Sequence, residues 1–178
     1  MKFTIPKNRK ELKQHLKDPL YRNSYYLMAN SIIGSGLGFF FWIVVARFYD
    51  ASDIGLAVAL ISSAGIVTSI SRFGIDVSII RFLSNKKDKG LFINTCLTVV
   101  GFATILISIV FLLSIDIWAQ KLVFIKDSAL YIFAFIVFTI ISALLVIMSN
   151  AFVALRDAEY ALFQNTIFAG LKVPLPIL

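Results

Sequence analysis

The chain has 178 residues, of which 59% are hydrophobic and 15% are charged, and its formal net charge is +7. Soluble domains contain about 45–50% apolar and about 25% charged residues, so this composition excludes an ordinary soluble domain. The one cysteine, Cys96, and the one histidine, His15, exclude a disulfide framework and a thiolate cluster within the chain, and we expect no metal site and no cofactor.

The N-terminal segment, residues 1–22, is strongly basic, with seven Lys or Arg side chains against Glu11 and Asp18. Lys/Arg-rich flanks of membrane spans stay on the cytoplasmic side and attract anionic lipid head groups. We therefore predict a cytoplasmic arm whose partners are membrane lipids and not nucleic acid. A leucine recurs every four residues from Leu12 to Leu20, so the arm is either flexible or an amphipathic helix on the membrane surface.

Four long runs without any charged residue follow the arm. A helix of 18 or more apolar residues is long enough to cross the roughly 30 Å hydrocarbon core of a bilayer. We predict an all-α polytopic transmembrane bundle of about five helices, with four spans at about residues 25–46, 54–71, 91–115 and 129–153. The charge-free runs on which these spans rest are Asn23 to Ala46, Ile54 to Ser71, Gly90 to Ile115 and Ser128 to Leu155.

The connections between the spans alternate in charge. From the arm onward, the net charges of the first four segments outside the spans are +5, −1, +3 and 0. The positive-inside rule then places the N-terminus in the cytoplasm of a multi-pass protein of the cell membrane. The basic third segment, Arg72 to Lys89, continues the second span into a mixed tail that extends to Ser84.

A fifth apolar run, residues 160–178, carries Lys172, Pro174 and Pro176 and stops without a polar flank. A finished span normally ends at polar or aromatic anchors. We expect a chain cut partway through a longer protein, and the rival interpretation is a small protein whose last segment is kinked or re-entrant.

Residues suited to catalysis are absent from this pattern. The four complete runs contain no ionisable acid or base, and the connections are too short to fold a catalytic domain. We therefore expect the chain not to be an enzyme.

Small and polar side chains are frequent within the first two spans. Gly34 and Gly38 have the GxxxG spacing that lets two membrane helices approach closely, so we predict a helix-packing role for them. Asn30, Ser62 and Ser63 either pack in the same way or line a hydrated cavity, where polar groups at membrane depth are tolerated.

Three cations near the spans are candidate ligands for an anionic substrate. Arg72 lies just beyond the second span, and Asp76 follows at a spacing that would pair the two on one helical face. Arg47 ends the first span, and Lys172 interrupts the fifth run. Each arginine either extends to the interface as an anchor or binds an anionic head group in a cavity, because guanidinium binds phosphate through two hydrogen bonds. A lysine within an apolar run favours a cavity-facing position.

Two stretches resemble a known transporter family. They are ARFYDASDIGLAVALISSAGIVTSISRFGIDVSIIRFLS, Ala46 to Ser84, and ALRDAEYALFQNTIFAGLK, Ala154 to Lys172. The Ala-Arg pair, the short acidic turn, the Ile-Gly-Leu start of the second span and the Phe-Gly-Ile turn are similar to those of Wzx-like polysaccharide exporters. These exporters belong to the multidrug/oligosaccharidyl-lipid/polysaccharide flippase superfamily and are distant relatives of MATE transporters.

The resemblance implies the N-terminal lobe of a MATE-like flippase fold, with the C-terminal half of the same transporter missing. It implies a polyprenyl-linked sugar substrate carrying phosphate, moved outward by alternating access, and a cavity containing Arg47, Arg72 and Lys172. Two other functions stay open from the residues, namely a cation-coupled drug or metabolite exporter of MATE type and a small membrane scaffold that assembles through Gly34 and Gly38. The lack of an acidic residue in the complete spans favours the sugar-lipid substrate.

Overall fold

The computed structural model describes residues 19–172, and side chains within residues 21–170. Residues 1–18 of the predicted arm and residues 173–178 of the fifth run lie outside this part. Residues 19–172 form helices without any strand, which confirms the all-α helical bundle. In chain order the helices are α2 (Pro19–Phe48), α3 (Ala51–Ser71), α4 (Ile75–Phe82), the 3₁₀ helix η1 (Leu83–Asn85), α5 (Lys89–Trp118), the 3₁₀ helix η2 (Gln120–Asp127), α6 (Ala129–Ala154) and α7 (Ala158–Lys172).

Four of these helices are long and apolar enough to cross a membrane. They comprise Tyr21–Phe48, Ala51–Ser71, Lys89–Trp118 and Ala129–Ala154. Each contains one of the predicted charge-free spans, and apolar side chains such as Ile32, Phe102 and Phe133 remain exposed on their outer faces. A bilayer is the solvent that such faces require. The protein is therefore a multi-pass membrane protein.

Several helix boundaries differ from those expected. Proline is tolerated in the first turn of a helix, where its missing N–H has no partner to lose, and α2 begins at Pro19. Residues 19–22 of the predicted arm thus belong to the first long helix. The predicted tail of the second span is also a separate element, because α3 ends at Ser71 and α4 begins at Ile75.

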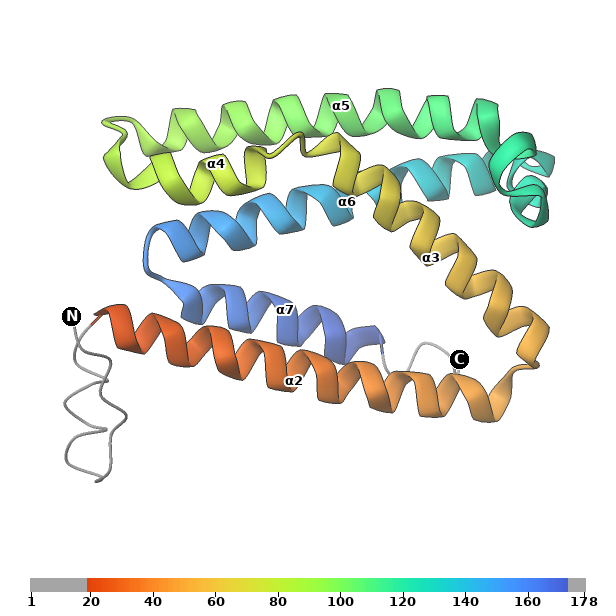
Figure 1. The fold of residues 1–178 in the computed structure, drawn as a ribbon, viewed down its shortest axis with the longest axis horizontal. Helices are drawn as coiled ribbons and strands as arrows, with labels where there is room; N and C mark the ends of the chain where they lie inside the picture. Colours follow the sequence, from red (N-terminus) through yellow and green to blue (C-terminus); the bar gives the residue numbers. More distant parts are fainter. Residues whose placement is uncertain (1–18, 173–178) are drawn as a thin grey trace.

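The helices pair in an order that differs from their order in the chain. Figure 1 shows α2 lying along α7, while α5 lies along α6 and α3 crosses them obliquely. The start of α2, the α4–α5 segment and the α6–α7 connection lie at one end of the molecule, here called the basic end. The α2–α3 connection and η2 lie at the other end, here called the η2 end.

The buried residues form two clusters that meet along α5 and α6. At the η2 end, residues of α3, α5, η2 and α6 pack together, and the rings of Phe111 and Phe135 stack with centroids 5.6 Å apart. At the basic end, α4 and η1 pack against α5 and α6 through Ile79 and Leu83, beside the buried Cys96. The second cluster explains why α4 lies along the bundle: its apolar face is buried against these two helices.

The contact between α5 and α6 also contains buried hydroxyl groups. Thr104 and Ser108 of α5 and Thr139 of α6 are fully buried. The Ser108 and Thr139 hydroxyl oxygens lie 3.0 Å apart, and Thr139 donates to the carbonyl of Ile136. Either hydroxyl can donate in the interhelical bond, since each carries one hydrogen and accepting lone pairs. This bond ties the two most apolar helices together where lipid supplies no hydrophobic driving force.

Candidate functional site

The turn between α3 and α4 holds the first candidate site. Phe73 and Gly74 both have positive φ angles, 44° and 76°, and the chain changes direction here between α3 and α4 (Figure 1). Glycine adopts this left-handed conformation without the steric penalty of a side chain. The Phe-Gly-Ile sequence was expected to form a turn, and the structure confirms it.

The charged pair at this turn is Arg72 and Asp76. The Arg72 Nε and Asp76 Oδ2 atoms lie 3.6 Å apart, and the two side chains are 19% and 24% exposed. The predicted pairing is therefore confirmed, but its expected setting on one helix is wrong. The helix breaks between the two residues, because Arg72 caps α3 and Asp76 lies in the first turn of α4.

The Arg72 guanidinium retains unused hydrogen-bonding capacity. One terminal amine donates to the Ser69 hydroxyl over 3.4 Å, but the buried Nε has no hydrogen-bond acceptor. A buried donor without an acceptor costs about 1–3 kcal/mol, more if it is charged. The α4 side of the turn is held by Asn150 of α6, whose amide donates to the Asp76 backbone carbonyl over 3.3 Å.

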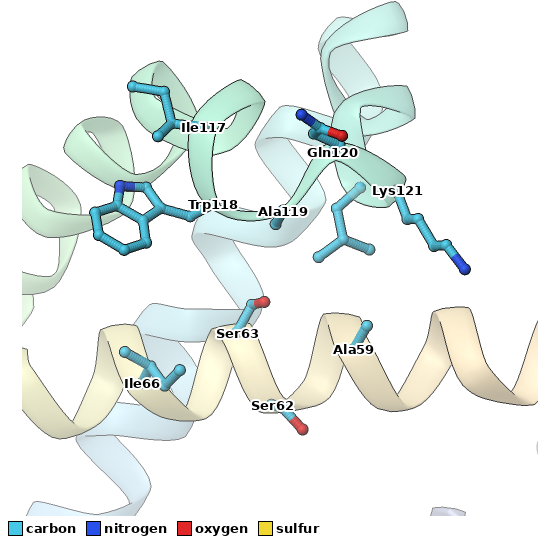
Figure 2. A pocket seen from close by; sticks show the side chains of 10 residues that line it. Ala59, Ser62, Ser63, Ile66, Ile117, Trp118, Ala119, Gln120 and Lys121 are labelled. Carbon is cyan, nitrogen blue, oxygen red and sulfur yellow. The ribbon is translucent and has the colours of Figure 1, made fainter.

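A groove at the η2 end forms the second candidate site (Figure 2). It has a volume of about 580 Å³ and lies between α3 and the corner where α5 passes into η2. The residues that line it are Ala59, Ser62, Ser63, Ile66, Ile117, Trp118, Ala119, Gln120, Lys121 and Leu122. Both predicted cavity serines are thus part of its wall. The Ser63 hydroxyl points toward η2, whereas the Ser62 hydroxyl points to the other side of α3.

The other predicted site residues lie elsewhere. Arg47 is exposed in the last turn of α2, and Arg72 follows the end of α3, so the whole of α3 separates them. At 1.5 Å per residue, that helix is about 30 Å long, and the two arginines cannot hold one phosphate group. Asn30 is partly buried on α2. Lys172 is the last residue of α7, and its side chain lies outside the described part.

The two glycines of the GxxxG pattern make no close helix contact within the described part of the chain. A Cβ atom added at Gly34 or Gly38 would meet no atom within 4 Å. Close packing through these glycines therefore stays a prediction for a partner outside residues 19–172.

Several polar residues that tie the helices together were missed from the sequence. Asn23 of α2 accepts a hydrogen bond from the Ala158 amide at the start of α7, and Gln164 of α7 donates to the Leu145 carbonyl of α6. In η2, Lys126 pairs with Asp116 at the end of α5. An amide side chain next to or within an apolar run is the available signal, since it needs a partner in the membrane.

Comparison with protein-family models, curated proteins and solved structures finds no match to this chain. Among the described residues, no group of three or more His, Cys, Asp and Glu side chains is placed to hold a metal ion. The candidate sites therefore rest on geometry and chemistry alone.

Proposed function

We propose that this chain forms part of a membrane flippase that exports a lipid-linked oligosaccharide across the cell membrane by alternating access. The observation that carries the proposal is Arg72, a guanidinium at a break between two helices whose side chain is 19% exposed and whose Nε faces Asp76 over 3.6 Å without a hydrogen bond. A phosphate oxygen is the acceptor that a guanidinium binds best, and the carrier of a lipid-linked sugar supplies phosphate. The resemblance of Ala46 to Ser84 to polysaccharide exporters favours the same substrate class.

The arrangement of the long helices also supports a transporter over an inert anchor. α2 packs along α7, whereas α3 packs on α5 and α6, and α2 and α3 touch little beyond their short connection. α7 also packs on α6, so only α2 and α3 are loosely joined. Helices that share few contacts can shift against each other at low cost, which alternating access requires. The positive-φ turn at Phe73 and Gly74 is a further point at which the backbone changes direction.

The test is export by the complete product of the gene that encodes this chain. In a strain without the native copy, Arg72→Ala should lower surface polysaccharide export at least about tenfold. This factor corresponds to the ~1.5–3 kcal/mol that a hydrogen bond to a charged group contributes. Arg72→Lys should restore only part of the activity, because a lysine keeps the charge but loses the planar fork of donors.

Arg81→Ala is the matched control. Arg81 lies in the last turn of α4, is exposed and sits over the ring of Phe82, so its removal changes the net charge equally without touching the turn. If the Arg72→Ala and Arg81→Ala strains export equally at equal protein levels, Arg72 does not bind the substrate and serves only as an anchor at the membrane interface. Loss of the whole gene that leaves surface polysaccharide intact but raises accumulation of cationic dyes would favour the drug exporter instead.

A further inference from the structure

The groove at the η2 end has a rigid base. Leu122 and Ile125 of η2 are almost completely buried against α3, α5 and α6, so the 3₁₀ helix is held firmly on the bundle. The groove wall that η2 provides is thus part of the packed fold. Its volume of about 580 Å³ lies within the 300–1,000 Å³ typical of ligand sites.

The polar groups around this groove lack partners within the described part of the chain. No hydrogen bond occupies the Ser63 hydroxyl, although Thr68 and Ser71 on the same helix bond to carbonyls of the preceding turn. Lys121 forms no ion pair, whereas its neighbour Lys126 is paired with Asp116. Within the described part of the chain, the groove wall therefore offers Lys121 as an unpaired cation and Ser63 as a hydroxyl without a partner.

Polarity changes along the groove in the direction expected for a lipid. Figure 2 places Lys121 on the side of Ala59, and Trp118 on the side of Ile66. Because α3 runs from the η2 end inward, Ala59 is nearer to that membrane surface than Ile66. Trp118 is 80% exposed at the end of α5, the level at which aromatic side chains meet lipid head groups.

We infer that this groove binds one anionic phospholipid of the bilayer. Its phosphate lies at the rim beside Lys121, its glycerol oxygens meet the Ser63 hydroxyl, and one acyl chain passes between Ile66 and Trp118. Lipid is the solvent around the spans, and Lys121, the one charged residue among the described residues of the groove wall, favours an anionic head group. The inference does not depend on the proposed export function.

Trp118 supplies the probe for a direct test. The chain has two tryptophans, and Trp42→Phe leaves Trp118 as the only one. This variant is placed in phosphatidylcholine vesicles that contain an equal fraction of brominated phosphatidylglycerol or brominated phosphatidylcholine, and quenching of Trp118 fluorescence is measured. We expect phosphatidylglycerol to be favoured about fivefold, which corresponds to the ~1 kcal/mol that a lysine contributes at an anionic lipid surface.

Two variants in this background separate the groove from the membrane surface in general. Lys121→Gln removes the free cation and Ser63→Leu fills the groove, and each should bring the preference close to one. Lys87→Gln is the matched control, because Lys87 is exposed in the basic segment at the opposite end and the same charge is lost. The Lys87→Gln variant should still prefer phosphatidylglycerol about fivefold. Circular dichroism should show equal helix content in all variants.

Three outcomes would overturn the inference. The first is equal quenching by the two brominated lipids. The second is an equal loss of preference in Lys87→Gln and Lys121→Gln. The third is a full preference in Ser63→Leu, which would show that Lys121 attracts anionic lipid to the surface without the groove.

Discussion

Small and hydroxyl-bearing residues occur both along the α5–α6 contact and along the exposed face of α2, but only the first set is buried. Thr104, Ser108 and Ala143 are fully buried between α5 and α6. Gly34 and Gly38 on α2 have open space where a side chain would start. In α5 and in α2 alike, small residues recur about every four positions, so this spacing does not tell a buried helix face from an exposed one. The difference is the partner: α6 supplies a complementary face to α5, and no helix within residues 19–172 supplies one to the glycines of α2.

The largest effect expected from this comparison is overpacking of the α5–α6 contact. Ala143→Leu inserts bulk at a site with no exposed surface, and it should lower the free energy of unfolding by about 1–3 kcal/mol. The measurement is reversible unfolding of the purified chain in mixed detergent micelles. Ala134→Leu is the matched control, because Ala134 lies on the exposed face of the same helix. Equal unfolding free energies for the two variants would contradict the assigned contact.

A smaller effect is expected from the interhelical hydrogen bond. A double-mutant cycle of Ser108→Ala and Thr139→Val should give a coupling energy of about 0.6 kcal/mol, the average for such bonds in membrane proteins. The control cycle pairs Ser114→Ala with Thr139→Val. Ser114 bonds only to carbonyls of its own helix, so its coupling to Thr139 should be zero within error. If the control cycle gave a coupling energy as large as the first cycle, the Ser108–Thr139 hydrogen bond would not be the source of that coupling energy.

The sequence was sufficient to predict the helical bundle because charge-free runs leave the backbone of a membrane protein few alternatives. It also predicted the turn at Phe73 and Gly74 and the pairing of Arg72 with Asp76. The separate helix α4 was missed, because the residues up to Ser84 were interpreted as a tail of the second span although the turn at Phe73 and Gly74 divides them.

The pairing of the helices could not be predicted in the same way. The long helices are apolar around most of their circumference, so hydrophobicity does not mark an inner face, and contacts depend on side-chain shape and single polar groups. Asn23, which bonds to the start of α7, lies far from Ala158 in the sequence. The groove itself was not predicted. Ser62 and Ser63 were expected either to pack or to line a cavity, and Trp118 and Lys121 lie in a connection for which no site was predicted.

The smallest effect is expected on the exposed face of α2. Gly34→Ala and Gly38→Ala add a methyl group that meets no atom within 4 Å, so the free energy of unfolding should not fall, and the higher helix propensity of alanine should raise it by at most about 1 kcal/mol. A loss would mean that the glycines already pack closely within the chain. Self-association, measured by cross-linking in the same micelles, decides what the face does. Lower association in both alanine variants, without a loss of stability, would identify Gly34 and Gly38 as contacts to a helix of a second molecule and would favour the scaffold function. Unchanged association would mean that this face of α2 contacts lipid or helices outside residues 19–172. The small residues of α2 would then differ from those of α5 and α6 only in what they pack against.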